Sequence, residues 1–547
     1  ISRMFSNCIA LLSLDLSNFR TDNVEDMSGL FQFCQGLEEL AVSRFKTDNV
    51  ISLSETFRSC KKIENLDLRS WNTEKVQYMD GLFFGCINLQ NIDFNFKTHN
   101  VKNMQHMFDS CNSLYQLDVS GFDTSQVEDL SYMFKDCSRL AKLDVSNFNT
   151  KQVINMAFMF DNCNRLTYLG ISGFDTSKVQ SMESMFRYNV GLTSLDLSNF
   201  DTSQVTSMSS LFESVFLLKT IDVSSFNTGK VTDMYKMFSN CRGLQSINLD
   251  NFDTSQVKDM TQMFDNCQLL TSLSLKNFRT TQLVFMYGMF YSCRNLKYID
   301  LSSFETPLVT DMASLFLQDS ELTTLILSDK FKTNSVVDMA NMFGMCSKLT
   351  SIDTSSFDTK EVENMEGMFK QCSKVTSLNL SKFNTKNVRN MREMFYYCTS
   401  LQYIDVSNFD TSEVTDMYGL FNTCPSLTSL ELSNFNTEKV VNMGNMFNKC
   451  SSIKYLNLKS FNTKEVTYMA FMFSYMDQLT SIDFSSSFIT EKVTTMVQMF
   501  NYCNSLKSLD LSFFNVEKVE VLAMMFQNDI NLEYLDIMEL SSNLLSQ

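Results

Sequence analysis

The chain has 547 residues and a formal net charge of −17. Such an acidic surface repels nucleic-acid phosphates and anionic membrane faces, and it favours a basic partner. No apolar run approaches the roughly 18 to 20 residues that cross a bilayer. We therefore expect no nucleic-acid partner and no direct membrane insertion of this segment.

The length would allow several domains, but the composition marks no boundary between them. Only two prolines occur, and no Gly/Ser-rich or Pro-rich linker is present. We predict one continuous body over residues 1–547. The opening ISRMFSNC enters the pattern described below in mid-repeat and lacks the regions of a signal peptide, and the final SSNLLSQ ends without a polar cap. We expect a fragment, or a processed product, of a longer chain.

One pattern repeats through the whole chain. Its consensus is M-x-x-M-F-x-x-C-x-x-L-x-x-L-D-L-S-x-F-x-T-x-x-V-x-x, which is 26 residues long and occurs in 21 copies. The two phenylalanine positions take 40 of the 49 phenylalanines. A unit this small cannot bury its apolar face alone, so neighbouring copies must stack into a solenoid.

The periodicity within one copy predicts its elements in order. Leu14 and Leu16 alternate with Asp15, which predicts a short strand with the leucines inward and the aspartate outward. Residues 27–34 place apolar side chains at i, i+3, i+4 and i+7, the pattern of one face of a helix. We predict an α/β solenoid, a right-handed leucine-rich-repeat-like coil of about 21 repeats of 26 residues. Its short parallel strands lie on the concave face, with short helices or helical turns opposite.

Departures from the consensus length occur at one point, the exit from the strand. The fourth copy reads DFNF at residues 93–96 and is one residue short, whereas residues 327–331 and 484–488 are each one residue long. Element exits tolerate such changes better than strand interiors. The threonine two residues after the second aromatic, as in Thr21, is expected to hydrogen-bond the backbone of a tight turn.

All sixteen cysteines occupy a single position of the repeat. The five other copies carry Asn189, Val215, Asp319, Met476 and Asp529 there. Uninterrupted runs of cysteines are all odd in number, so neighbour-to-neighbour disulfides would leave thiols over, and we predict buried free thiols. Zinc is disfavoured because no Cys-x-x-Cys occurs and the only two histidines lie in one copy. We expect no cofactor and no metal.

The residues MFSNC-IALLSLDLSNFRTDNVEDM carry a family resemblance. The pattern resembles the 26-residue leucine-rich repeats of the BspA-like surface proteins, and the resemblance extends over the whole chain. It implies a leucine-rich-repeat solenoid displayed on a cell surface or outside the cell, associated with adhesion to host matrix, to other cells or to a partner protein. The family supplies no catalytic residues to carry over.

No catalytic constellation can be assembled from the sequence. The histidines are too few for a His-based nucleophile or base, and no glycine-rich phosphate loop occurs. The carboxylates recur by register, whereas a catalytic pair is set apart by its environment. We therefore predict that the chain is not an enzyme.

The outward strand position is the candidate binding surface. Thirteen copies carry Asp there, and five carry Tyr two residues earlier. Such a row attracts basic side chains, and tyrosines anchor interfaces. The candidate partner-binding stripe comprises Tyr168, Asp196, Asp222, Tyr298, Asp300, Tyr403, Asp405 and Tyr455. Alternatively, Asp and Ser only keep the sheet surface wet. A divalent cation shared by adjacent aspartates would need more ligands than two side chains.

Two functions remain open from the sequence. The first is a non-enzymatic protein-binding or adhesion solenoid on a cell surface, whose acidic sheet meets a protein partner in the matrix, on a cell or in a second copy. The second is a structural scaffold rod, cytoplasmic or cytoskeletal in a protist, that organises other proteins or forms filaments. Buried unpaired thiols suit a reducing compartment and favour this second reading.

Overall fold

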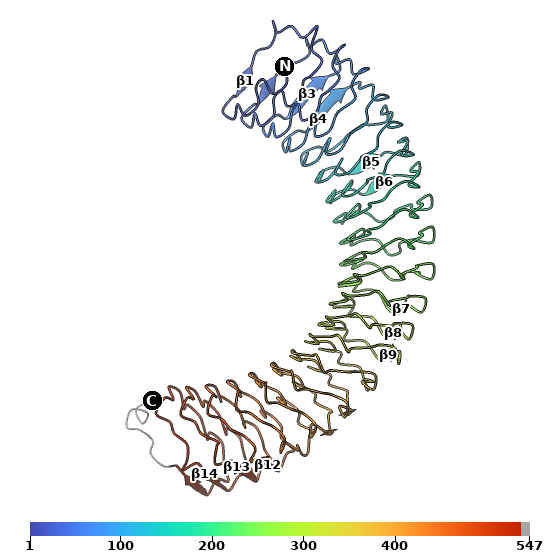
Figure 1. Ribbon diagram of the computed structural model, residues 1–547. Coiled ribbons are helices and arrows are strands. Elements are labelled where there is room, and N and C mark those ends of the chain that lie inside the picture. Colours follow the sequence, from blue (N-terminus) through green and yellow to red (C-terminus); the bar gives the residue numbers. More distant parts are fainter. Residues whose placement is uncertain (538–547) are drawn as a thin grey trace. The chain divides into compact units, whose positions relative to one another are not determined.

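The computed structural model describes residues 1–537 of the chain (Figure 1). The segment SSNLLSQ lies outside the described residues. The chain divides into two compact units, Ile1–Phe278 and Arg279–Gln547. Each unit is a stack of similar coils, which confirms the repeat and the solenoid (Figure 1). That residues 1–547 form a single solenoid stays a prediction.

Short parallel strands mark one side of the coils, and each pairs with the strand one repeat away. Leu14 lies opposite Leu40, and Asn65 opposite Asn91, so equivalent positions are in register. The first unit contains β1 (Ser13–Leu14), β2 (Glu39–Leu40), β3 (Asn65–Leu68), β4 (Asn91–Phe94), β5 (Lys142–Asp144), β6 (Tyr168–Gly170) and β7 (Ser272–Ser274). The second contains β8 (Tyr298–Leu301), β9 (Thr324–Leu327), β10 (Ser377–Leu378), β11 (Tyr403–Ile404), β12 (Tyr455–Leu458), β13 (Ser481–Phe484), β14 (Ser508–Asp510) and β15 (Tyr534–Asp536).

The core of each unit is built from columns of equivalent side chains. The rings of Phe31 and Phe57 stack with centroids 5.7 Å apart and an interplanar angle of 14°. In the second aromatic row, Phe45 and Trp71 stack at 6.2 Å and 3°. All four are buried. The phenylalanine rows of the sequence are therefore continuous aromatic columns that hold one coil on the next.

The predicted helices opposite the strands are wrong: no helix occurs in residues 1–537. Gly29 and Phe33 both have a φ of +60°. A right-handed helix requires negative φ at every residue. The backbone alternates its partners, because Leu30 N–H donates to Met27 O within the coil at 3.1 Å, whereas Phe31 N–H donates to Thr56 O of the next coil at 2.9 Å. The segment is a run of turns.

Coil spacing explains why turns replace helices. An α-helix is about 10 Å wide with its side chains, whereas neighbouring strands lie about 4.8 Å apart. The Phe31 to Phe57 distance of 5.7 Å shows that the turn side repeats at nearly the strand spacing, so a helix in every coil would not fit. Because a turn recurs every four residues, the apolar side chains of residues 27–34 still point inward, as they would from one face of a helix.

The threonine row joins successive coils. Thr21 Oγ1 donates to Lys46 O at 2.9 Å and accepts from Lys46 N–H at 2.7 Å. The same pair of bonds links Thr202 to Asn227. The predicted bond to the backbone is confirmed, but the backbone belongs to the next coil. The hydroxyl therefore takes the place of a backbone hydrogen bond between the two coils.

The cysteine row is a column of free thiols, as predicted. Fifteen of the sixteen are buried and Cys8 is exposed. Cys34 Sγ–H donates to Phe5 O at 3.0 Å, and Cys60 Sγ–H donates to Phe31 O at 3.1 Å. The N–H of the preceding cysteine also hydrogen-bonds the sulfur. The thiol at this position therefore both donates and accepts a hydrogen bond.

Two of the substitutes for cysteine, Asn189 and Asp319, make only part of this pair of bonds. Asn189 Nδ2 donates to Phe160 O at 2.8 Å, but its Oδ1 has no partner. Asp319 Oδ1 accepts from Cys293 N–H at 2.8 Å, and its Oδ2 is buried without a partner. An ionised carboxylate can only accept, so desolvation raises the pKa of Asp319 well above its usual 3.8.

The thiol column predicts a sharp contrast in reactivity. The thiolate is the reactive form, and burial raises the pKa of Cys86 and of Cys424 to about 12. We expect a disulfide reagent such as DTNB to modify Cys8 rapidly in the folded protein, while the fifteen buried thiols react only after unfolding. Titration in guanidinium chloride should recover all sixteen. Fast reaction of several thiols in the folded protein would contradict the column.

Replacing Asp319 with cysteine should stabilise the second unit. The change removes a buried acceptor without a partner, which costs about 1–3 kcal/mol, and restores the donor. Because the pKa of Asp319 is raised in the folded state, this residue destabilises the fold increasingly as the pH rises above 3.8, and the loss of stability is complete above the folded-state pKa. We therefore expect Asp319→Cys to raise Tm more at pH 8 than at pH 4. Asp329→Asn, which removes an exposed carboxylate, is the control and should leave Tm nearly unchanged. An equal gain in Tm for Asp319→Cys at both pH values would refute the explanation by a buried carboxylate.

Candidate functional site

The tyrosines of the predicted stripe lie exposed on the strand side of the coils. Tyr168 begins β6 and is 50% exposed, and Tyr403 begins β11 and is 60% exposed. Tyr298 and Tyr455, which begin β8 and β12, are also exposed. The alternation of the sequence places them outward while the next residue, such as Leu169 or Ile404, is buried.

The eight stripe residues fall into two groups. Tyr168, Asp196 and Asp222 lie in the first unit, in three consecutive coils. The second unit carries the other five, and there Tyr298 and Asp300 share one strand with the hydroxyl 3.4 Å from Asp300 Oδ2. Each group is therefore a candidate surface of its own unit.

The outward aspartates have a structural role that the sequence reading missed. Asp196 Oδ1 accepts from Ser198 N–H at 3.1 Å, and Asp405 Oδ1 accepts from Ser407 N–H at 3.0 Å. Oδ1 makes this bond to the N–H two residues later in Asp15, Asp67, Asp118, Asp144, Asp196, Asp222, Asp300, Asp353, Asp405 and Asp510. The carboxylate closes an Asx turn that ends the strand. The Asp-x-Ser spacing of the consensus was the available signal.

The turn leaves these carboxylates charged and half free. Hydrogen bonds from the Ser198 hydroxyl and N–H lower the pKa of Asp196, and those from Ser407 lower the pKa of Asp405. Both serine bonds at Asp405 use Oδ1, and no hydrogen bond to Oδ2 occurs within the described residues. A capped aspartate such as Asp405 therefore offers one accepting oxygen to a partner, whereas Oδ2 of Asp67 is already bound by Arg69 at 2.8 Å.

Two coils of irregular length break this rule. In the long coil after β13, Ser485 Oγ takes over the cap by accepting from Ser487 N–H at 2.9 Å. Asp483 Oδ2 is then released to accept from Tyr455 Oη and Lys459 Nζ, each at 2.8 Å. In the short fourth coil, Asp93 has no capping bond among the described residues. Length changes thus alter what the outward carboxylate can bind.

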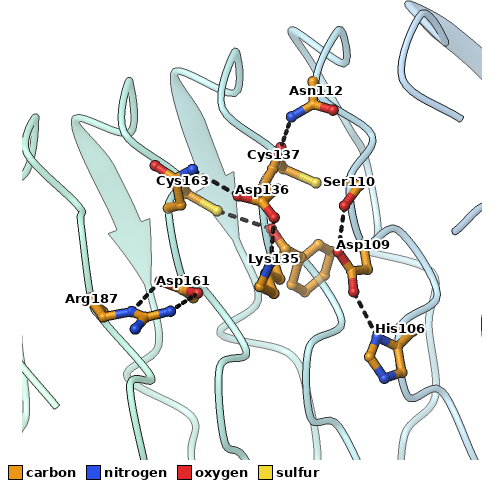
Figure 2. Close-up of polar contacts among 12 residues, drawn as sticks. His106, Asp109, Ser110, Asn112, Lys135, Asp136, Cys137, Asp161, Cys163 and Arg187 are labelled. Carbon is orange, nitrogen blue, oxygen red and sulfur yellow. Dashed lines mark hydrogen bonds and ion pairs between the residues drawn. The ribbon is translucent and has the colours of Figure 1, made fainter. Parts of the chain in front are cut away.

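A network of polar and charged side chains covers the turn side of coils in the first unit (Figure 2). His106 Nδ1 lies 2.6 Å from Asp109 Oδ2, and Ser110 Oγ donates to Asp109 Oδ1 at 2.8 Å. The Arg187 guanidinium donates two hydrogen bonds, of 2.9 and 2.8 Å, to the carboxylate of the buried Asp161. Sequence analysis missed this network, although the 26-residue spacing of Asp161 and Arg187 was a signal.

The network does not assemble a nucleophile. Ser110 and His106 both bind the same carboxylate, so the hydroxyl is not hydrogen-bonded to the imidazole as nucleophilic catalysis would require. The His106 ring is instead stacked on Tyr132, with centroids 4.4 Å apart. The His106 to Tyr132 stack and the Arg187 to Asp161 pair bridge neighbouring coils, whereas the bonds to Asp109 lie within one coil. Their chemistry is that of structural ion pairs and aromatic stacking.

Residues 1–537 contain neither a metal-binding cluster nor a membrane-spanning helix. No group of three or more His, Cys, Asp or Glu side chains in that range could hold a metal ion. No helix in the same range is long and apolar enough to cross a membrane.

Three bacterial leucine-rich-repeat structures resemble the chain at low identity. The protein of Eubacterium ventriosum is 16% identical, with 60% of this chain and 82% of that one covered and a TM-score of 0.34. The leucine-rich-repeat protein of Bacteroides ovatus is 14% identical, with 89% of this chain and 87% of that one covered and a TM-score of 0.24. A leucine-rich cell surface protein of Faecalibacterium prausnitzii is 18% identical, with 52% of this chain and 84% of that one covered and a TM-score of 0.28. These likenesses are too distant to indicate function.

Comparison with curated proteins gave no match. A family model, in contrast, matches residues 1–117, 87–192, 156–276, 191–298, 284–404, 397–485 and 480–541. These matches overlap and together extend over nearly the whole chain. The chain therefore belongs to the family described as Mycoplasma protein of unknown function, DUF285.

Proposed function

We propose that the chain is a non-enzymatic protein-binding solenoid of BspA-like kinship, displayed on a cell surface, with residues 1–547 forming one continuous stack. Its strand side, with the stripe tyrosines and aspartates, contacts a protein partner that presents basic side chains. The resemblance of the repeat supports the kinship and the surface display. A repeat solenoid is a fold well suited to extended binding surfaces.

One observation carries the choice of surface. Tyr403 is 60% exposed and begins the strand β11, and Asp405, two residues on, is outward on the same face. The carboxylate has its Oδ1 held by Ser407 and its Oδ2 open. An exposed aromatic ring beside a fixed negative charge combines an apolar anchor with a charged acceptor for Arg or Lys. In the same unit, Tyr298 and Asp300 also place an exposed ring beside a capped carboxylate, although there the Tyr298 hydroxyl lies 3.4 Å from Asp300 Oδ2.

The buried free thiols support a second candidate. Fifteen buried cysteines without disulfides are compatible with a reducing compartment, where the chain would serve as a structural scaffold rod. Protease treatment of intact cells separates the two candidates. Digestion of the protein on intact cells supports surface display, and protection until the cells are lysed supports the scaffold.

The stripe can be tested without damaging the turns. Asn retains the capping oxygen, as Asn379 shows by accepting from Ser381 N–H at 3.2 Å. We expect Asp300→Asn and Asp405→Asn combined with Tyr403→Ala to weaken adhesion of the purified protein to host cells at least tenfold, because the anchor and two charges are lost. Flow cytometry with labelled protein measures this.

The control for that experiment keeps the change in charge and alters another surface. Glu491→Gln and Glu517→Gln remove two exposed charges in turns away from the strands, and adhesion should stay unchanged. Thermal melting should give the same Tm for both variants, within a few degrees. Undiminished adhesion of the stripe variant would refute this choice of surface.

A further inference from the structure

The short fourth coil opens a hollow on the strand side of the first unit. One residue is missing after β4, and the next coil has no strand at residues 115–118, a stretch that the structure describes throughout. No backbone hydrogen bond joins residues 115–118 to β4 or β5 there. A hollow of about 560 Å³ lies there, and its lining includes Asn91, Asp93, Tyr115, Asp118 and Lys142. A second hollow of about 260 Å³ adjoins it and shares Asp118.

Two carboxylates face this hollow with accepting oxygens to spare. Asp118 Oδ1 caps Ser120 N–H at 2.9 Å, and its Oδ2 has no hydrogen bond in the described residues. Asp93 has neither a capping bond nor an ion pair there, because the residue that would follow its strand is missing. Arg69 lies near enough for a charge interaction with Asp93, but its guanidinium is engaged with Asp67 through bonds of 2.9 and 2.8 Å. Lys142 lines the hollow and forms no ion pair among residues 1–537.

Other coils show what such a carboxylate binds. Arg69 grips Asp67 with two nitrogens, Lys459 binds Asp483 at 2.8 Å, and Arg44 contributes a favourable charge to Asp15. Arg44 stands ten residues after its cysteine, and the fifth copy has Gly121 at that position. A Cβ added to Gly121 would meet no atom within 4 Å. The space beside Gly121 is therefore open. In the second copy, the equivalent residue Arg44 directs its guanidinium from this position toward Asp15, the outward carboxylate of the preceding coil, and Asp93 is the equivalent carboxylate here.

We propose that this hollow receives the guanidinium of an arginine from the protein partner, with Asp93 as the principal acceptor and Asp118 as the second. Tyr115 is 46% exposed and is held by a 2.7 Å bond from its hydroxyl to Asn91 Oδ1, so its ring can flank the planar cation. Asp93 has both oxygens open, which suits the two parallel bonds of an arginine fork. The inference rests on the proposed function and names the chemistry of one subsite.

The probe is Nα-acetyl-arginine methylamide, measured by saturation-transfer NMR on the full chain. The matched ligand is Nα-acetyl-citrulline methylamide, which has nearly the same shape and no charge. We expect binding of the arginine compound and at least fivefold weaker binding of the citrulline compound. Asp93→Asn should weaken arginine binding at least fivefold, because one charge-assisted acceptor is lost.

Gly121→Arg provides an independent test, because its own guanidinium would occupy the hollow as Arg44 occupies the place near Asp15. We expect this variant to lose arginine binding while keeping its Tm. Asp510→Asn is the control, since Asp510 has the same register as Asp93, accepts a capping bond as Asp118 does and lies outside the hollow, so binding should not change. Equal arginine binding by Asp93→Asn, Gly121→Arg and the unaltered chain would overturn the proposal, as would equal binding of citrulline.

The two proposals fail in different ways. The adhesion experiment alters only Tyr403, Asp300 and Asp405 in the second unit, and the NMR experiment alters only the hollow in the first. Loss of adhesion in the stripe variant with no arginine binding by the hollow refutes the subsite alone. Arginine binding with unchanged adhesion of the stripe variant refutes the stripe and leaves the hollow as the contact site.

Discussion

The structure depends on one constraint: each coil must present its donors and acceptors to equivalent groups one repeat away. Backbone N–H groups of the turn side donate to the next coil, threonine hydroxyls bridge where the ladder is interrupted, and thiols donate to a phenylalanine carbonyl of the coil before. A coil in isolation would leave all these groups unpaired. The repeat is therefore strict at positions that look chemically interchangeable, because a residue there is chosen for its hydrogen bonds as well as for its volume.

The columns of the fold were predictable because repetition itself specifies them. Once Phe and Cys recur every 26 residues, stacking of like on like follows, and the free thiols follow from the odd runs. The helices were not predictable in the same way. The spacing of the apolar residues in 27–34 reports which side chains are buried, and a run of turns with Phe33 at φ 60° buries the same set. Only the coil spacing distinguishes the two backbones, and it is a property of the stack.

The candidate surface shows the same division. The outward direction and exposure of the tyrosines could be predicted from alternation alone. The Asx turns required reading the aspartate together with the serine two residues later, a local signal that was present in the consensus. The hollow beside Asp93 could not be predicted, although the missing residue was visible in the sequence. Its consequence depends on the surroundings, here an uncapped carboxylate in the short coil beside residues 115–118, whose backbone is unpaired.

Under the proposed function, regular and irregular coils contribute differently to recognition of a partner. In a regular coil the outward aspartate spends one oxygen on its own turn, so a row of such coils presents a uniform negative surface that attracts basic partners without distinguishing among them. A coil of altered length changes the partner of its carboxylate: Asp483 turns to a lysine and a tyrosine of its own unit, whereas Asp93 remains open. Under the proposed function, attraction arises from the many equivalent coils and selectivity from the few irregular ones, so the length of the stack and its irregular coils serve different parts of binding.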